Sequence, residues 1–591
     1  MNANNIAETT AAAAAAATAC HPIPDARGTN LYTADPTLGA LLGLYLPPEL
    51  RAHLEPHLQR LGGQAGGPMD ELAAEADRNP PTLSLRTRTG LDAEKIHKHP
   101  AYVELEKIAF AEYGLAALSH RGGVLGWPTP MPAAAKYALS YLFVQAEFGL
   151  CCPLSMTDSL TRTLRKYGDP ALVERYLTAL TSQDFEQFSQ GAMFMTEQGA
   201  GSDIAATEVR AQPDGDSYRL WGDKWFCSNP DAGLAMVLAR IDGAPAGLKG
   251  VSLFLLPRQL PEGRVNDYRI IRLKDKLGTR SMASGEVRLE GARAWLVGEA
   301  GRGFQQMADM VNNSRLSNGM RAAGLMRRAC GEALHVAHHR QAFGRRLVDM
   351  PLMQRQLLKL MLPTEQARTM MFQTAEALRR SDAGEDGAYA LVRILTPLIK
   401  FRACRDARRV TGDAMEVRGG CGYIEEWSDP RLVRDAHLGS IWEGTSNIVA
   451  LDVIRAARRE GSLPVLKAHL EALRAESTLA PRTRDVLEQT AERALALTEQ
   501  LAQTRGADDH VARQAASALY HITSATAMAW EASKLGDANR MRLAQLVMRH
   551  RVLPQDPLQA EAPAPWLIQL LDPDAGDGGV GQVPVETVDL L

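Results

Sequence analysis

The chain has 591 residues, which is too many for one compact core, so we expect several packed units. Its net charge of −3 gives no whole-chain attraction to nucleic acid. No apolar run is long enough to span a membrane, and the 7 cysteines show no metal-ligand spacing, so we predict neither a membrane span nor a metal site.

The first half of the chain divides into a leader, a helical block and a strand block. Residues 1–26 are Ala-rich and lack the pattern of a secretory signal, so we expect a disordered leader and a cytoplasmic protein. Residues 27–190 have mostly helical periodicity. Residues 191–298 alternate with period two between turns, which predicts a small antiparallel β-domain with strands near 217–221, 235–241, 250–257, 268–273 and 285–289.

Helical periodicity returns in the second half. Residues 299–455 predict a helical bundle, and residues 456–551 predict an additional helical domain. Residues 552–591 contain seven acidic residues and no Lys or Arg, so we expect a tail that is disordered or loosely docked. Successive blocks of helices, strands and helices argue against a doubly wound dinucleotide fold, in which the two would alternate.

Two motifs of the β-domain suit a flat, partly charged ligand. In residues 195–203 (MTEQGAGSD), glycines allow close backbone approach while Thr196 and Ser202 supply hydroxyl groups. In residues 224–230 (KWFCSNP), Trp225 and Phe226 can pack on a ring system while Ser228 bonds its polar edge. Taken singly, the first motif fits an ordinary turn and the second fits a plain core strand.

Together, in content and spacing, the two motifs resemble the flavin-binding β-domain of acyl-CoA dehydrogenases. Three further motifs follow in the order of that family: residues 340–344 (RQAFG), 416–423 (EVRGGCGY) and 440–447 (SIWEGTSN). The resemblance implies a mostly α fold with a middle β-domain. In that fold an N-terminal helical domain, an antiparallel β-domain and a C-terminal four-helix bundle would here be followed by the extra helical domain.

The resemblance also implies FAD between the β-domain and the bundle. Arg340, Phe343 and the Gly419–Gly420 turn match positions that reach the cofactor of a neighbouring subunit, which implies a homo-oligomer, in the family usually a tetramer. Glu416 stands where many members have Gln, which puts that FAD contact in doubt. The other implied cofactor contacts are Met195, Thr196, Gly201, Ser202, Trp225, Phe226, Cys227, Ser228, Thr445 and Asn447.

The family reaction takes a proton from the α-carbon of an acyl-CoA while the β-hydrogen leaves as hydride to the flavin. Glu443 occupies the position of the catalytic base, although a surface glutamate in a Gly-rich loop is the alternative interpretation. One branch carries its base instead where this chain has Ser314, which cannot serve. Ser202 and Arg315 are implied to lie beside the acyl-CoA, and an electron-transfer flavoprotein is an implied partner.

Residues 29–32 (TNLY), 79–81 (NPP), 99–101 (HPA) and the extra helical domain resemble the AidB-type branch, which is linked to DNA alkylation damage. That likeness implies double-stranded DNA binding with weak dehydrogenase activity. Residues 456–551 hold 14 Lys/Arg and 11 Asp/Glu, a modest net of +3. We therefore rank the enzyme first and a DNA-binding flavoprotein second, with a flavin scaffold without chemistry third; a local basic patch could still come from Arg540, Arg542, Arg549 and Arg551.

Overall fold

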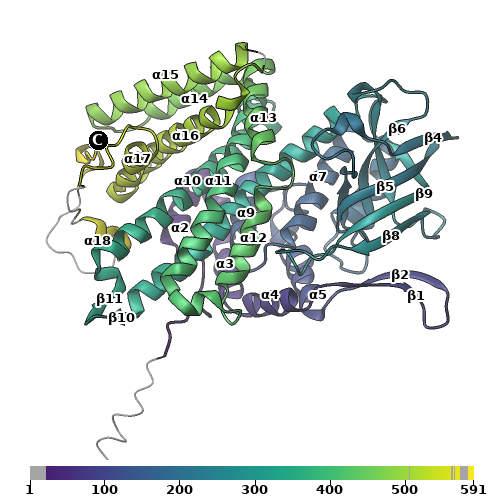
Figure 1. The fold of residues 1–591 in the computed structure, drawn as a ribbon, viewed down its shortest axis with the longest axis horizontal. Coiled ribbons are helices and arrows are strands. Elements are labelled where there is room, and N and C mark those ends of the chain that lie inside the picture. The colour runs from purple at the N-terminus through teal and green to yellow at the C-terminus, as the bar shows by residue number, and fades with distance from the viewer. Residues whose placement is uncertain (1–21, 505, 561–563, 565, 573–582) are drawn as a thin grey trace, which may run out of the picture.

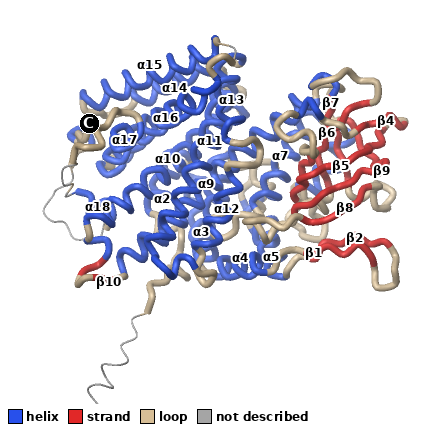
Figure 2. The backbone as a smooth tube through the Cα atoms, viewed as in Figure 1, coloured by secondary structure: helices blue, strands red, loops and turns tan. Residues whose placement is uncertain are grey.

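A computed structural model describes residues 22–504, 506–560, 564, 566–572 and 583–591. The predicted leader lies almost wholly outside the described residues. Figure 1 shows a helical part joined to a β-domain, and Figure 2 shows that nearly all strands lie on one side. The N-terminal helices are α2 (Pro36–Tyr45), α3 (Pro48–Gly66), α4 (Pro68–Arg78), α5 (Pro100–Glu106), α6 (Ala133–Phe143), α7 (Cys151–Tyr167) and α8 (Pro170–Leu180). Most begin with proline, whose fixed φ suits the first helical position.

The N-terminal region also contains a two-stranded hairpin that the sequence pattern did not predict. Its strands are β1 (Thr82–Arg86) and β2 (Asp92–His97). Glu94 on β2 bonds to Arg258 at 3.3 Å and Arg269 at 3.0 Å, and it accepts the Ile270 amide at 2.9 Å. The hairpin therefore extends from the helical part to the β-domain and ties the two together (Figure 1).

The β-domain is a seven-stranded sheet that closes on itself. Strand β6 pairs antiparallel with β7 and parallel with β3 and β4, so the predicted all-antiparallel pairing is wrong for these two contacts. The ring closes in the order β6, β4, β5, β9, β7, and its interior is fully buried. The strands are β3 (Gly191–Phe194), β4 (Arg210–Asp214), β5 (Ser217–Ser228), β6 (Leu234–Ile241), β7 (Val251–Pro257), β8 (Tyr268–Leu273) and β9 (Ser284–Leu296).

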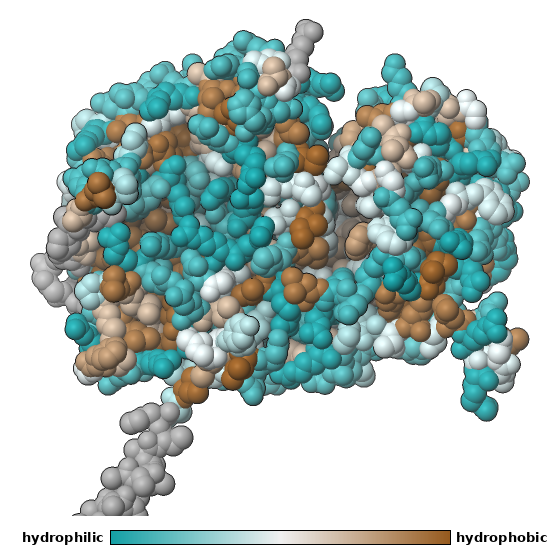
Figure 3. Space-filling model, in the orientation of Figure 1, coloured by the Kyte–Doolittle hydropathy of each residue, from teal (hydrophilic) through white to brown (hydrophobic). Residues whose placement is uncertain are grey.

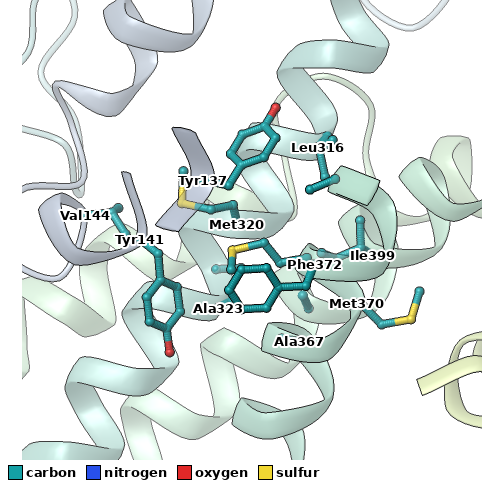
Figure 4. Packing of buried hydrophobic residues seen from close by; sticks show 14 of the residues in the cluster. Tyr137, Tyr141, Val144, Leu316, Met320, Ala323, Ala367, Met370, Phe372 and Ile399 are labelled. Atoms are coloured by element: carbon teal, nitrogen blue, oxygen red, sulfur yellow. The ribbon is translucent and has the colours of Figure 1, made fainter. Parts of the chain in front are cut away.

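The C-terminal helices pack on one another and on the N-terminal helices. Figure 4 shows the core where α6 meets three of these helices, α9, α10 and α11. Tyr141, Met320, Phe372 and Ile399, one from each helix, belong to the same buried hydrophobic cluster. Close packing of this kind holds each helix in one register. The helices are α9 (Gly303–His339), α10 (Pro351–Asp382), α11 (Ala388–Arg418), α12 (Asp429–Gly439), α13 (Ser446–Arg459), α14 (Ser462–Ala475), α15 (Pro481–Gln503), α16 (Ala512–Leu535), α17 (Ala538–Arg551) and α18 (Trp566–Leu571); β10 (Gln341–Ala342) and β11 (Arg345–Arg346) form a short hairpin.

The extra helical domain is joined to the bundle through buried ion pairs. Arg540 on α17 bonds to Glu531 on α16 at 2.6 Å and to Glu365 on α10 at 2.9 Å. Glu365 also accepts from Arg368, whose guanidinium bonds to Asp35 at 2.6 Å. Arg540 is buried, so it does not contribute to the local basic patch that the sequence left open.

Residues 583–591 of the acidic tail are docked, whereas residues 554–560 are exposed. Val585 and Val588 are buried, and the Gln545 side chain on α17 bonds to the Val588 carbonyl at 2.7 Å and the Leu590 amide at 2.9 Å. Asp572, next to α18, pairs with Arg346 at 2.9 Å. Residues 583–591 are therefore more firmly attached than the sequence predicted, because this segment buries apolar side chains although it also carries acidic ones.

A buried carboxyl joins the β-domain to the bundle. Asp435 on α12 accepts the backbone amide of Thr279, between β8 and β9, at 2.6 Å. Burial raises the pKa of Asp435 from 3.8 to about 7, with the nearby Glu147 adding to the rise and the Thr279 bond opposing it. The folded state therefore binds this proton more tightly than the unfolded state does, and stability is lost as the pH rises from the unfolded pKa through the folded one.

We expect Asp435→Asn to be more stable than the wild type at about pH 8, by on the order of 1–3 kcal/mol, because the amide keeps the acceptor without a buried charge. The difference should shrink towards about pH 5, where the wild-type carboxyl is protonated. Thermal unfolding of both proteins across this range measures the difference. A gap that is independent of pH would show that the Asp435 proton is not linked to folding.

Candidate active site

Glu443 lies in the segment between α12 and α13. Its side chain is 6% exposed. Oε1 accepts a hydrogen bond from the Ser314 hydroxyl on α9, while Oε2 has no partner among the described residues. Glu443 is therefore a positioned, largely desolvated carboxylate with one free acceptor oxygen, and not a surface glutamate.

The backbone at Glu443 adopts an uncommon conformation. Its φ is +55°, a left-handed value that non-glycine residues seldom adopt and that costs about 1–3 kcal/mol. Arg315 Nε donates to the Glu443 carbonyl at 2.9 Å, and Lys400 Nζ donates to the Gly444 carbonyl. Asp452 on α13 bonds to Arg315 at 2.7 Å, so the loop is clamped from two helices.

The two β-domain motifs are physically joined. Lys224 in β5 bonds to the Glu197 carboxylate at 2.6 Å, and both side chains are buried. Glu197 also accepts the Glu208 amide at 2.7 Å. The Trp225 amide donates to the Thr196 carbonyl at 2.8 Å, which places the segment with Thr196 directly beside the Trp225 strand. Because a buried ion pair tolerates little displacement, these contacts fix the first motif on the second.

The strand with Trp225 has a register shift between Lys224 and Cys227, and its side chains there differ in exposure. Phe226 is 55% exposed, and Lys274 Nζ lies 3.5 Å from the centre of the Trp225 ring. The side chain of Cys227 is fully buried in the β-domain core, so only the backbone of this residue could contact a cofactor. Burial raises the pKa of Cys152, on α7, to about 11, and a hydrogen bond with Ser228 opposes that rise. This hydrogen bond shows that α7 lies beside the end of the Trp225 strand.

The predicted residues of the helical part divide into two groups. Glu443, Ser314 and Arg315 meet, and Thr445 and Asn447 stand exposed at the start of α13 beside them. Arg340 and Phe343, next to and within the β10–β11 hairpin, lie at the end of the helical part away from the β-domain (Figures 1 and 2). Within one chain the second group is therefore remote from Glu443.

The remote group has its own local order. Arg340 Nη1 donates to the Arg418 carbonyl at 3.2 Å, directly before the Gly419–Gly420 turn. Gly419 has a φ of +73°, which favours glycine, and no atom lies within 4 Å of a Cβ built on Gly420. Phe343 is 95% exposed. An arginine beside an open glycine turn suits the binding of a phosphate-bearing group.

Sequence reasoning missed two buried cations at the site. Lys400 on α11 is buried, and burial lowers its pKa to about 8. Arg321 on α9 has its Nη2 at 3.9 Å from Glu443 Oε1. Arg321 follows Ser314 by seven residues, so helical spacing alone could have placed the two on one face. No sequence signal indicated Lys400, because the contact comes from a separate helix.

Figure 3 shows the surface hollowed between the helical part and the β-domain, with hydrophobic residues on its helical side.

Across the described ranges, no helix has the length and apolar character needed to cross a membrane, and no three His, Cys, Asp or Glu side chains are arranged to hold a metal.

Three family models match the chain in consecutive blocks. Residues 22–187 match the N-terminal domain of the adaptive response protein AidB. Residues 192–292 match the middle domain of acyl-CoA dehydrogenases, and residues 301–458 match their C-terminal domain. The order agrees with the helical, β and helical blocks of the structure.

Curated proteins and solved structures give the same assignment. The chain is 34% identical to the putative acyl-CoA dehydrogenase AidB of Escherichia coli, over 75% of this chain and 80% of that one. It is 33% identical to acyl-CoA dehydrogenase family member 11 of Caenorhabditis elegans, over 72% and 70%. The structure of Caenorhabditis elegans ACDH-11 in complex with C11-CoA matches with a TM-score of 0.81 at 28% identity, covering 90% of this chain and 93% of that one. The predicted fold class is confirmed.

Proposed function

Because the chain belongs to the acyl-CoA dehydrogenase family, we propose that it is an FAD-dependent oxidoreductase that introduces a double bond between the α- and β-carbons of an acyl-CoA thioester. The observation that carries this proposal is the Glu443 carboxylate, which is buried, held by Ser314 and left with Oε2 free. A free acceptor oxygen in a desolvated position suits removal of an α-proton.

The residues present fit FAD. Trp225 and the exposed Phe226 offer an aromatic surface, with the Ser228 hydroxyl at the end of the same strand. Thr196 is held next to Trp225, and Thr445 and Asn447 stand exposed at the start of α13. We propose that these residues, together with Met195, Gly201 and Ser202, hold the flavin. When bound, FAD supplies the acceptor for the β-hydride.

In the proposed reaction, each residue near Glu443 has a distinct role. Ser314 donates to Oε1 and so directs Oε2 towards the α-proton, which leaves the protonated carboxyl as product of that step. Arg315 and Lys400 act on backbone carbonyls and position the Glu443 segment. We propose that the Glu443 amide donates to the thioester oxygen, where negative charge develops as the proton leaves.

The direct test is anaerobic titration of the yellow protein with a panel of acyl-CoA thioesters. The flavin absorbance should bleach with at least one of them. A flavin that no thioester reduces would argue against the dehydrogenase. We propose an electron-transfer flavoprotein as the natural acceptor, which reoxidation kinetics with candidate acceptors would test.

We propose a homotetramer in which Arg340, Phe343 and the Gly419–Gly420 turn of one subunit complete the FAD site of another. Support comes from the distance of this group from Glu443 within one chain and from the exposure of Phe343 and Tyr423, because large exposed apolar side chains in one region are typical of interfaces.

Arg340→Ala is expected to weaken FAD retention, because one charge-assisted contact contributes about 1.5–3 kcal/mol, or roughly 10- to 100-fold in affinity. Gel filtration in the presence of added FAD should show the same oligomer as the wild type. The measurement is the flavin-to-protein absorbance ratio after dialysis, with Arg302→Ala as a control at an exposed arginine. Unchanged retention would contradict the cross-subunit assignment.

A second candidate function is non-specific binding of double-stranded DNA, which the likeness to AidB motivates. The structure weakens its charge argument, because Arg540 is buried between two glutamates. Any remaining attraction should fall steeply with salt. Fluorescence anisotropy with a duplex across a salt series tests this, and no binding at low salt would remove the candidate.

A further inference from the structure

Arg321 carries a buried guanidinium with two terminal nitrogens that lack a hydrogen-bond partner in the part of the chain that the structure describes. The residue is 0% exposed, and its Nε donates to the Ser317 carbonyl at 3.4 Å. The rings of Phe148 and Trp442 lie 5.6 Å and 4.5 Å from the guanidinium carbon. Such contacts contribute ~0.5–2 kcal/mol, which is less than the several kcal/mol that burying an ion costs.

Arg321 lies next to the proposed base and not on the exposed side of α9. Ser314 and Arg321 lie seven residues apart on α9, about two helical turns. Side chains on a helix lean towards its N-terminus, so the Arg321 guanidinium returns towards Glu443. Nη2 stops 3.9 Å from Oε1, beyond hydrogen-bond distance, and Oε1 already accepts from Ser314. The guanidinium is therefore next to the proposed base without being bonded to it.

The charges near Glu443 are unbalanced. Arg315 is paired with Asp452, but Lys400 bonds to a backbone carbonyl and Arg321 has only the distant Glu443 oxygen. Two buried cations thus face one carboxylate. Buried charge of one sign is stable when a counter-ion with acceptor oxygens enters the site. A plain alkyl chain entering beside Arg321 would leave the guanidinium unsatisfied.

One small cavity of the described residues is lined by Ser317 and Met320, two neighbours of Arg321 on α9. The cavity has a volume of about 20 Å³, room for one water molecule. Its lining includes the Lys136–Asp158 ion pair at 2.8 Å and the Tyr137 hydroxyl, which has no partner among the described residues. Its volume leaves no room for a long alkyl tail.

On the basis of the function proposed above, we propose that Arg321 binds a carboxylate at the far end of a short acyl chain, so that the preferred substrates are dicarboxylic acyl-CoA thioesters. Arg–carboxylate pairing satisfies both terminal nitrogens at once and restores the charge balance. The terminal carboxylate does not react: the α-proton still goes to Glu443 and the β-hydride to bound FAD, which leaves the unsaturated dicarboxylic thioester.

The test compares glutaryl-CoA with pentanoyl-CoA, two thioesters with the same number of acyl carbons, by calorimetric titration of the FAD-loaded protein. The wild type should bind glutaryl-CoA about 10- to 100-fold more tightly, as expected for charge-assisted hydrogen bonds of about 1.5–3 kcal/mol. Arg321→Met, which keeps a long side chain without charge, should lose or reverse that preference. Arg321→Lys should keep part of it, and Arg302→Met, at an exposed arginine, should keep all of it.

The outcomes separate this inference from the proposed dehydrogenation. Equal binding of both thioesters by the wild type, or tighter binding of pentanoyl-CoA, overturns the role of Arg321 without any variant. An equal loss for both thioesters in Arg321→Met also overturns it, because that result means a role at the shared thioester end. If glutaryl-CoA binds preferentially but bleaches no flavin, the acyl specificity stands and the proposed dehydrogenation is wrong. If pentanoyl-CoA alone bleaches the flavin, the dehydrogenation stands and the proposed specificity is wrong.

Discussion

Glu443→Gln is expected to lower the rate of flavin reduction by about 10²- to 10⁴-fold, the usual contribution of a general base. The amide keeps the size of the side chain and can still accept from the Ser314 hydroxyl, but it cannot take up the α-proton. The proposed FAD contacts come from other residues, so the flavin spectrum and content should not change. Stopped-flow bleaching with the best thioester of the panel, under anaerobic conditions, measures the rate.

Ser314→Ala is the matched control for this prediction. It removes the hydrogen bond to Oε1 and leaves the carboxylate, so we expect a loss of roughly tenfold or less, in line with one hydrogen bond. Reduction of Glu443→Gln within a few-fold of the wild-type rate would mean that another group takes the proton. An equal loss in both variants would assign the effect to the geometry of the pair and not to the base.

The sequence predicted those parts of the site that lie within short motifs. Thr196 and Trp225 were expected to lie together because the resemblance to acyl-CoA dehydrogenases implied that both contact the flavin, and the structure joins their segments through the buried Lys224–Glu197 pair. Glu443 was indicated by its flanking residues. These contacts join separate segments of the chain, so the resemblance of the motifs to a known family predicted them, and local spacing did not.

Contacts between distant helices were beyond such reasoning. Arg321 and Lys400 sit within ordinary helical stretches, and only the packing of α9 and α11 beside the Glu443 segment makes them part of the site. The same limit explains Arg540, which resembles a surface arginine in sequence but meets Glu365 from α10. The parallel contacts of β6 were likewise missed, because alternation predicts strands and not their partners.

Glu531→Ala is expected to cost about 3–5 kcal/mol of stability, because it removes one partner of a buried ion pair and leaves other groups unsatisfied. Glu531 is 0% exposed. Its Oε1 accepts from the Tyr45 hydroxyl at 2.7 Å, and its Oε2 accepts from Thr369 at 2.8 Å and from Arg540 at 2.6 Å. These partners belong to α2, α10 and α17, so the loss should reach the helical bundle as well as the extra domain.

Thermal unfolding followed by circular dichroism measures this loss, with Glu376→Ala as control, since Glu376 forms a partly exposed pair with Arg379 on α10 and should contribute less than about 1 kcal/mol. Replacing both partners, as Glu531→Leu with Arg540→Met, should recover part of the loss, because no buried charge of that pair is then left without its partner. A single, lower transition in Glu531→Ala would indicate that the extra domain and the bundle unfold as one unit. A separate early transition, with the flavin still bound, would instead show that the buried network holds the extra domain without supporting the bundle that carries Glu443.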